Sequence, residues 1–386
     1  MMRFTFIHTA DWQIGKRFGG FDERLAGRLE EARLDAIDRL AELAGEHSAS
    51  HVLVAGDVYD APGLKERTLR QPLSRMGSYP NVRWVLLPGN HDPAGPGSVW
   101  TSVRRIGVPG NVIIADTAVP FELAPGVVVL PAPLMGKATL SDPTAWMDGS
   151  GPFDGGIRIG LAHGGVHGFG SEGECAVPID SNRVGSARLD YLALGDWHGM
   201  KRIGPRCWYA GTPEPDNFAN SAKGHALVVR IEKERGDPDV LPVQIGAFTW
   251  VRHEARITSS AEFAALEREI QPAAGEARRT LVNLKFSGSL TAQDLSLLEA
   301  WLADLDGRLQ YLNADTAEIA LAVEADENAM AAIFGADGEL REVAERLAKL
   351  ARGQDGSTAG EVLPPEVART ALLRLMTFAR AESESV

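Results

Sequence analysis

Cysteine is scarce in this chain of 386 residues, which has two, Cys175 and Cys207. Two cysteines are too few for a disulfide-stapled scaffold and are typical of a reducing compartment. No apolar run reaches the length of a membrane span, and the first residues become polar too quickly for a signal peptide. The chain also lacks both the Rossmann glycine fingerprint and the P-loop. We therefore expect a cytoplasmic protein without a membrane partner, outside the dinucleotide-binding and P-loop enzyme classes.

Basic residues are also fewer than acidic ones, with 39 Lys and Arg against 52 Asp and Glu. The formal net charge of −13 argues against a protein whose whole surface binds nucleic acid. The acidity is uneven, however: the segment from Glu254 onward carries a net −10, whereas the first 253 residues carry −3. Basic residues cluster in the first part at Lys16/Arg17, Arg24/Arg28, Lys65/Arg67/Arg70, Arg104/Arg105 and Lys201/Arg202/Arg206. A nuclease is therefore not excluded, and its DNA affinity should be weak, salt-sensitive and metal-dependent.

Strands and helices alternate through the first 235 residues. The sequence predicts amphipathic helices at Glu23–Gly45 and Leu64–Met76. It predicts buried strands at Arg3–His8, His51–Ala55, Val82–Leu87, Val127–Leu130, Ile157–Ala162, Tyr191–Leu194, Cys207–Tyr209 and Ala226–Ile231. This alternation is typical of an α/β sheet with parallel strands.

The pattern changes near residues 236–248, where Gly-Asp-Pro-Asp-Val predicts a hairpin or a linker. A small α+β unit is expected next, with strands at Phe248–Ile257, Thr280–Phe286, Leu309–Leu312 and Glu318–Val323 and helices at Ser260–Ile270 and Thr291–Leu305. Two amphipathic helices, Glu339–Ala351 and Pro364–Glu382, flank a flexible linker around Gly353–Gly360. We expect domains at 1–235 and 248–335, followed by a helical segment at 336–386.

Side chains that can bind metals follow five of the predicted strands. They lie in the runs TADWQ (Asp11, Gln13), GDVYD (Asp57), GNHD (Asn90), AHGG (His163) and GDWHG (Asp196, His198). In open α/β sheets the ligand crevice lies outside the carboxyl ends of the strands, so we expect one crevice to collect these groups. A mixed set of oxygen and nitrogen donors suits one or two divalent cations, with Mn²⁺ the natural compromise. Neighbouring glycines let the backbone turn tightly and leave room for a phosphate.

These five motifs, in this order, resemble the signature motifs of calcineurin-like metallophosphoesterases, and most closely those of the SbcD-type DNA repair exonucleases. The resemblance covers roughly residues 1–235 and, more weakly, the following region as a capping domain. It implies an α/β fold: an α/β/β/α sandwich followed by a small α+β capping domain and C-terminal helices. It also implies a metal-dependent DNA nuclease that acts as an exonuclease, with endonuclease activity as a further expectation. The partner that it implies is an SMC-like (AAA-type) ATPase resembling SbcC.

The resemblance implies roles for individual residues. Asp57 would bridge two divalent ions, Mn²⁺ or else Mg²⁺. The other ligands would be Asp11, Gln13 and His198 for the first ion and Asn90, His163 and Asp196 for the second. His91 would protonate the leaving oxygen, and Asp92 would orient the His91 ring through its N–H.

Gln13 and Asp196 depart from the family's pattern, which usually has histidine at both positions. A glutamine carbonyl is a weaker ligand than imidazole, and an aspartate adds a hard oxygen, so the altered site should favour Mn²⁺ or Mg²⁺ over softer metals. The departures keep open a regulatory or scaffold subunit with a weakened metal site. A small-molecule or protein phosphoesterase is the other alternative, because the same site serves those reactions.

Substrate contacts are expected from Lys16, Arg17, Asp60, Trp197 and His167. Trp197, like Trp12, could stack on an unpaired base, although packing beneath a ligand loop is the favoured interpretation for both. His167 could reach a phosphate, but a solvated loop position is favoured. The segment Asp216–Phe218 either shapes the substrate groove or forms a plain turn.

The C-terminal helices carry apolar faces, one with Leu340 and Val343 and another with Val367 and Leu372. The resemblance implies that the segment Glu339–Arg380 docks on the coiled coil of the ATPase partner. The alternatives are that these helices pack on the capping domain or form a homodimer.

Overall fold

The computed structural model describes residues 2–151, 155–168, 176–219, 223–272, 275–321, 333–334, 338–351, 364–365, 367–368, 370–372 and 374–376. Cys175, the predicted linker Gly353–Gly360 and much of the predicted helix Pro364–Glu382 lie outside the described residues. The chain forms two compact units, Met1–Val251 and Arg252–Val386.

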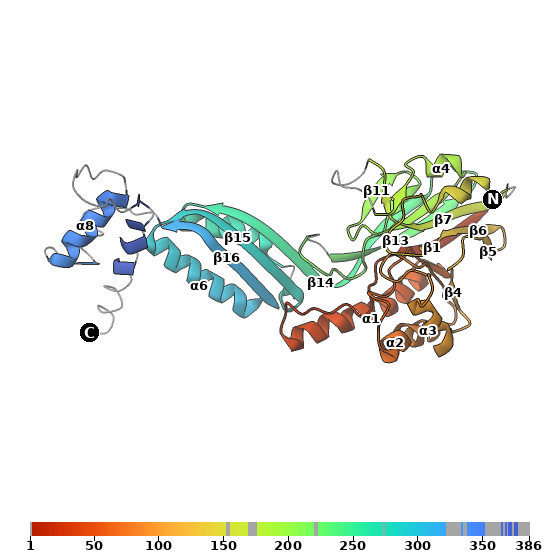
Figure 1. Ribbon diagram of the computed structural model, residues 1–386, viewed down its shortest axis with the longest axis horizontal. Coiled ribbons are helices and arrows are strands. Elements are labelled where there is room, and N and C mark those ends of the chain that lie inside the picture. The colour runs from red at the N-terminus through yellow and green to blue at the C-terminus, as the bar shows by residue number, and fades with distance from the viewer. Residues whose placement is uncertain are drawn as a thin grey trace. The chain divides into compact units, whose positions relative to one another are not determined.

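A mainly parallel sheet forms one layer of the first unit (Figure 1). Its parallel strands are β1 (Arg3–Thr9), β2 (His51–Val54), β3 (Arg83–Leu86) and β4 (Val112–Ile114), and the antiparallel strand β13 (Lys223–Glu232) lies beside β1. Successive side chains point to opposite faces of a strand. Val52 and Val54 accordingly belong to one hydrophobic cluster, and Leu53 to another on the opposite face. The sheet is therefore buried on both faces, as parallel sheets are.

Helices cover one face of this sheet. They are α1 (Glu23–Glu46), α2 (Glu66–Gly77) and α3 (Val99–Ile106), the last of which the sequence did not predict. The Asp22 side chain caps α1 by accepting N–H bonds from Arg24 at 2.9 Å and Leu25 at 3.0 Å. The apolar face of α1 packs in the same cluster as Trp84 of β3 and Trp100 of α3.

A six-stranded sheet packs on the other face. Its strand order is β11 (Lys201–Gly204), β12 (Cys207–Tyr209), β10 (Tyr191–Gly195), β7 (Ile157–His163), β6 (Val127–Ala132) and β5 (Phe121–Ala124). The four strands β6, β7, β10 and β12 are parallel. The outer face carries η1 (Ala145–Gly149), α4 (Arg183–Ser186) and the short pair β8 (Gly165–Val166) and β9 (Pro178–Ile179). The predicted α/β/β/α sandwich is confirmed.

The segment after β13 is a hairpin rather than a linker. Strand β14 spans Asp239–Ile257 and pairs antiparallel with β13, with Val240 opposite Val229. Gly236, with φ of 98°, lies in the connecting turn. The predicted start of this strand at Phe248 is therefore wrong, because the segment before it contains Pro242 and Gly246, residue types that are depleted in strands.

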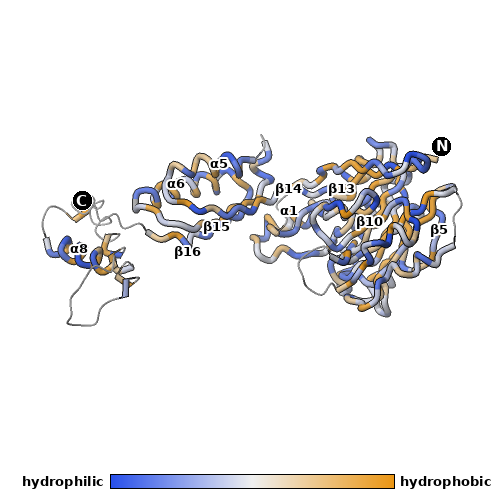
Figure 2. The backbone as a smooth tube through the Cα atoms, turned by 90° about the horizontal axis from the view of Figure 1, so that it is seen from above, coloured by the Kyte–Doolittle hydropathy of each residue, from blue (hydrophilic) through white to orange (hydrophobic). Residues whose placement is uncertain are grey.

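In the second unit the strand order is β16-β15-β14. Helices α5 (Phe263–Ile270) and α6 (Ala292–Arg308) lie over one face of this sheet, as Figures 1 and 2 show. Two single turns, η2 (Ser260–Glu262) and η3 (Ala277–Arg279), precede α5 and β15. Strands β15 (Thr280–Leu290) and β16 (Tyr311–Leu321) are parallel. The prediction of two short strands, Leu309–Leu312 and Glu318–Val323, is wrong: one continuous strand with largely exposed side chains replaces them within the described residues.

Helix α8 spans Glu339–Ala351, with the predicted bounds. Its Ala344 and Ala348 are buried against Leu372 in a small hydrophobic cluster. Leu340 and Val343 on the same helix are 55% and 49% exposed. The apolar surface of α8 is thus partly buried within its own segment and partly open.

Candidate metal centre

The ends of five strands from the two sheets meet at one place. Strands β1, β2 and β3 of the first sheet lead into Asp11, Asp57 and Asn90. In the second sheet His163 is the last residue of β7, and Asp196 follows β10. Asp11, Asp57 and His163 each offer a ligand atom within 4.8 Å of the other two, and all three are buried. The predicted ligands Asp11, Asp57 and His163 therefore lie together at the strand ends.

Three oxygen atoms lie around the Nε2 atom of His163, closely enough to share an ion with it. This atom lies 3.0 Å from Asn90 Oδ1, 3.5 Å from Asp57 Oδ1 and 3.7 Å from Asp196 Oδ1. Ligands at about 2.1 Å from an octahedrally coordinated ion lie about 3 Å apart when adjacent and about 4.2 Å apart when opposite. These spacings match, so the residues fit a divalent cation.

The ring of His163 is set up for metal binding. Its Nδ1–H donates to the carbonyl oxygen of Ala55 at 2.8 Å, which turns Nε2 toward the oxygen atoms of Asn90, Asp57 and Asp196. The ring is fully buried, so its orientation is fixed by packing as well as by this hydrogen bond.

The backbone at this centre adopts conformations that the fold must enforce. Asp11, Gln13, Asp57 and Asp196 all have positive φ, between 45° and 98°. Non-glycine residues adopt such angles rarely and concentrate at functional sites when they do. Neighbouring glycines make room for the ligands: a Cβ on Gly89 would lie 2.1 Å from Asp57 Oδ1. The close approach of the Asp57 carboxylate therefore requires glycine at position 89.

Several acidic groups are buried together, and their pKa values reflect it. Burial raises the pKa of Asp11 to about 6. Burial and the neighbouring charge of Asp57 raise the pKa of Asp92 well above its usual range. Burial alone would lower the pKa of His163, but the charges of the surrounding carboxylates outweigh it and raise that pKa to about 9. A bound cation would stabilise the ionised carboxylates in this centre.

The Gln13 side of the centre is arranged differently. Gln13 Nε2 lies 3.3 Å from His198 Nε2, and Gln13 Oε1 accepts a hydrogen bond from Lys16 Nζ at 3.2 Å. Lys16 also forms an ion pair with Asp216, and His198 Nδ1 lies 3.2 Å from the other Asp216 oxygen. Burial opposes protonation of His198, but the hydrogen bond with Asp216 raises its pKa. The predicted ligands Gln13 and His198 are thus next to each other, but their polar atoms already have partners.

His91 stands at the edge of the centre, with its side chain 43% exposed and its Nε2 3.9 Å from Asp57 Oδ2. Its Nδ1 lies 2.9 Å from the carbonyl oxygen of Asp60, which accepts the ring N–H. The ring therefore presents Nε2 toward the crevice, where a leaving oxygen can reach it.

Asp92 does not orient His91, and that expectation is corrected. Its two carboxylate oxygens accept backbone N–H bonds from Gly89 at 2.7 Å and Tyr59 at 3.0 Å. Asp92 therefore ties the loop after β3 to the loop after β2. The ring of His91 is held by the backbone of Asp60 instead.

The remaining predicted residues lie in different settings. Trp12 is buried and packs edge to face on Trp84, with ring centroids 5.9 Å apart, in agreement with the packing interpretation. Trp197 is 43% exposed, and the Lys201 ammonium lies 5.4 Å from its ring centroid. His167 and Arg17 are exposed, and neither is among the atoms that converge on the centre.

Sequence reasoning missed Arg33. This buried residue of α1 donates from Nη1 to the carbonyl oxygen of Trp12 at 2.7 Å, directly behind the Asp11 loop. Its Nε and Nη2 atoms have no hydrogen-bond partner within the described residues. An arginine on the otherwise apolar face of α1 was the available signal. Its charge offsets part of the negative charge of the centre.

A cavity of about 420 Å³ adjoins the centre at His198. It is lined by Trp197, His198, Gly199, Met200, Lys201, Thr212, Pro215, Asp216, Asn217, Lys223, Gly224 and His225. The predicted substrate residue Trp197 thus belongs to a hollow that carries lysine, histidine and amide groups.

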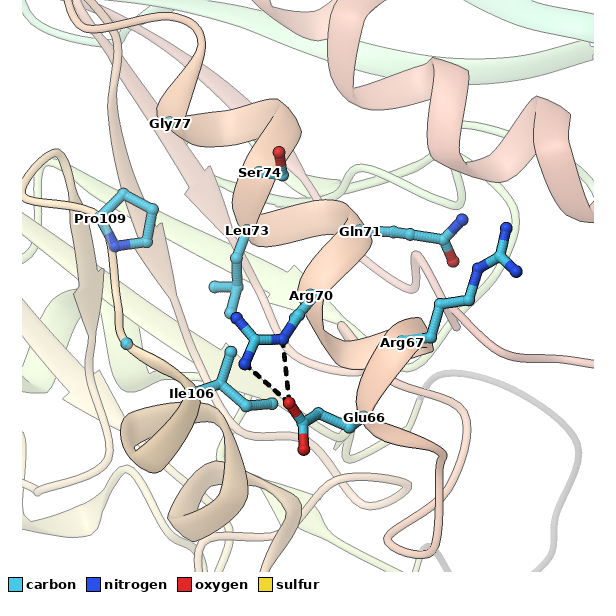
Figure 3. Close-up of a pocket in the computed structure, with 10 residues that line it drawn as sticks. Glu66, Arg67, Arg70, Gln71, Leu73, Ser74, Gly77, Ile106 and Pro109 are labelled. Carbon is cyan, nitrogen blue, oxygen red and sulfur yellow. Dashed lines mark hydrogen bonds and ion pairs between the residues drawn. The ribbon is translucent and has the colours of Figure 1, made fainter.

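A second hollow, of about 630 Å³, lies along α2 (Figure 3). It includes Arg67 and Arg70 of a predicted basic cluster, and Arg70 pairs with Glu66 at 2.7 Å. None of the residues proposed for catalysis or metal binding lines it. Glu66 neutralises the charge of Arg70 in this hollow. We therefore look for the functional site at the strand ends, where the predicted metal ligands lie.

Residues 4–230 match the profile of the calcineurin-like phosphoesterase family. Among curated proteins, the chain is 26% identical over 277 residues to the SbcD component of nuclease SbcCD from Rhodobacter capsulatus, covering 58% of this chain and 65% of that protein. It is 28% identical over 147 residues to the same component of nuclease SbcCD from Bacillus subtilis, covering 35% and 36% of the two chains. The matches therefore span less than two thirds of the length of these relatives.

Solved structures with a similar arrangement include TT1561 of Thermus thermophilus, with a TM-score of 0.39 and 11% identity, covering 62% of this chain and 99% of that one. Purple acid phosphatase PPD1 of yellow lupin has a TM-score of 0.42 and 11% identity, covering 62% and 53%. Among the helices that the structure describes, none combines the length and apolar character needed to cross a membrane.

Proposed function

The chain belongs to the calcineurin-like phosphoesterase family, and from this premise we propose that it is a metal-dependent nuclease that hydrolyses phosphodiester bonds in DNA during repair. We propose exonuclease activity, with endonuclease activity as a further expectation, in the cytoplasm. The observation that carries the proposal is the donor set around His163, with His91 beside it.

The metal site supplies the charge that this chemistry needs. A bound divalent ion would lower the pKa of an attacking water and neutralise charge on the phosphoryl oxygens. Mn²⁺ is the proposed ion and Mg²⁺ the alternative, because oxygen atoms dominate the donor set. The resemblance predicts two ions, and the donors around His163 support one of the two positions.

The side chains around the ion have separate tasks. His91, when both ring nitrogens carry a proton, donates the Nε2 proton to the leaving oxygen, which is otherwise expelled as a strongly basic alkoxide. The Asp60 carbonyl accepts from Nδ1–H and so holds the ring with Nε2 toward the crevice. Asp92 keeps the two loops that carry Asp57 and His91 at a constant separation.

DNA is favoured over a small ester by the surroundings of the centre. The cavity at His198 is large enough for a nucleotide, and Trp197 offers an exposed ring for stacking. Lys201 and Lys223 line the same cavity. Two of the relatives are named as subunits of a nuclease, which supports the same substrate class.

We also propose an SMC-like ATPase, resembling SbcC, as a partner. The support is the subunit name of the relatives and the exposed side chains of Leu340 and Val343 on α8. A Leu340→Asp, Val343→Asp variant should lose binding to a co-expressed ATPase of this kind while nuclease activity of the isolated chain persists. Unchanged co-purification would contradict docking through this helix and favour a homodimer or packing within the chain.

Two other functions remain in competition. A small-molecule or protein phosphoesterase would use the same centre, and a regulatory subunit would retain the fold with a weakened metal site. Purified chain with Mn²⁺ should be assayed on linear double- and single-stranded DNA, on a p-nitrophenyl phosphodiester and on a phosphoprotein. Cleavage of DNA supports the proposal, hydrolysis of the esters or phosphoprotein alone supports the first alternative, and inactivity with every metal supports the second.

A further inference from the structure

We infer that this chain holds one divalent metal ion, and that a closed ring of hydrogen-bonded side chains takes the position where the family's pattern places the other ion. The members of the ring are Lys16, Gln13, His198 and Asp216. The inference rests on the proposed metal-dependent function and specifies the metal content of the same centre.

Each pair of neighbours in the ring is joined by one contact. Asp216, which is 8% exposed, accepts from His198 Nδ1–H at 3.2 Å. The Nε2 atom of the same ring lies 3.3 Å from Gln13 Nε2. Gln13 Oε1 accepts from the Lys16 ammonium at 3.2 Å, and Lys16 returns to the second oxygen of Asp216.

Lys16 determines which way the Gln13 amide faces. If the amide were turned over, its NH₂ group would point at the Lys16 ammonium, and two donors would face each other. The oxygen of Gln13 therefore points to Lys16 and the NH₂ group points to His198. An NH₂ group has no lone pair available for a metal, so Gln13 does not act as a ligand beside His198.

The two halves of the centre differ in what they offer a cation. On the His163 side, Nε2 and three oxygen atoms converge without an ammonium group among them. On the Gln13 side, the Gln13 NH₂ group faces His198 Nε2, the Gln13 oxygen accepts from Lys16, and the positive charge of Lys16 is already in place. Bringing a second dication there would break the ring and place it against Lys16.

The ammonium of Lys16 also provides part of what a second ion would supply. It is a fixed positive charge beside the centre, held by a buried carboxylate and 28% exposed. A phosphoryl oxygen that enters the crevice can receive a hydrogen bond from it. One divalent ion and the Lys16 ammonium would then supply the positive charge at the centre, in place of the two divalent ions of the family's pattern.

Metal content tests the inference directly. The full-length chain is saturated with Mn²⁺ in weakly alkaline buffer and freed of excess metal. Manganese per chain is then counted by elemental analysis, and the electron paramagnetic resonance spectrum is recorded. The expected result is one manganese per chain with the spectrum of an isolated ion. Two per chain, or the exchange-coupled spectrum of ions about 3.5–4 Å apart, would overturn the inference.

A paired substitution tests the role of the ring. Gln13→His combined with Lys16→Met restores an imidazole donor and removes the cation, so this variant should take up a second manganese with a coupled spectrum. The matched control is Lys349→Met, at an exposed position of α8, and this variant should still bind one manganese ion per chain. A folded double variant that still binds one ion would show that the ring does not exclude the second.

The proposed function fails separately from this inference. A chain with one bound ion that leaves DNA intact contradicts the nuclease proposal alone. A chain that cuts DNA with two ions bound contradicts the inference alone.

Discussion

Substitution of His91 by asparagine separates proton donation from metal binding. His91 Nε2 lies 3.9 Å from Asp57 Oδ2, and the ring is 43% exposed, so His91 is near the ion site without belonging to the donor set around His163. The variant should bind Mn²⁺ with unchanged affinity and stoichiometry. Loss of general acid assistance should lower kcat on DNA by about 10²–10⁴-fold, which corresponds to about 3–5 kcal/mol.

Two substrates make this prediction sharper. The sugar alkoxide that DNA releases is strongly basic and needs a proton, whereas p-nitrophenolate is a weak base that leaves unprotonated. His91→Asn should therefore impair DNA cleavage strongly and hydrolysis of a p-nitrophenyl phosphodiester little. Single-turnover rates with both substrates and calorimetric titration with Mn²⁺ provide the comparison. Equal losses on both substrates would refute the role of leaving-group acid, as would full activity on DNA.

Three further outcomes follow from the same geometry. Gly89→Ala would place a Cβ 2.1 Å from Asp57 Oδ1, so Mn²⁺ affinity measured by calorimetry should fall at least about tenfold, whereas Gly19→Ala, with no neighbour within 4 Å, should leave it unchanged. Trp197→Ala should weaken binding of short single-stranded DNA about tenfold, from loss of stacking, without changing p-nitrophenyl ester turnover; equal affinity would contradict stacking. Burial lowers the pKa of His8 from 6.5 to about 3, so the unfolded state binds more protons in that window, and the free energy of unfolding should fall as pH drops through it. Urea unfolding at several pH values measures this, and a flat profile for the wild type, or one that His8→Asn does not flatten, would contradict it.

The fold, and the convergence of Asp11, Asp57 and His163, were predictable because their signals are local. Each of the five metal-ligand motifs directly follows a buried strand, and parallel strands present their carboxyl ends at the same edge of a sheet. Asp57 and His163 could therefore be assigned to one crevice although they are far apart in the chain. The fold class and the family were accessible for the same reason.

The details that depend on packing were not predictable. Asp92 is adjacent to His91 in sequence, yet its carboxylate turns back to the backbone of Gly89 and Tyr59. Lys16 meets Asp216, which is 200 positions away in the chain, so no local pattern linked them. The first half of β14 contains Pro242 and Gly246, which are depleted in strands, and its pairing with β13 is what makes it a strand. In each case a tertiary contact or solvent exposure decided the outcome.

Cleavage of linear DNA by the full-length chain, compared with its Asp57→Ala variant, tests the central claim most directly. Asp57 is 2% exposed and contributes an oxygen 3.5 Å from His163 Nε2, so its removal should abolish metal binding at this centre. The account predicts cleavage by the wild-type chain with Mn²⁺, none after chelation, and none by a folded Asp57→Ala variant. Equal cleavage by both proteins, or none by the wild type with either Mn²⁺ or Mg²⁺, would contradict it.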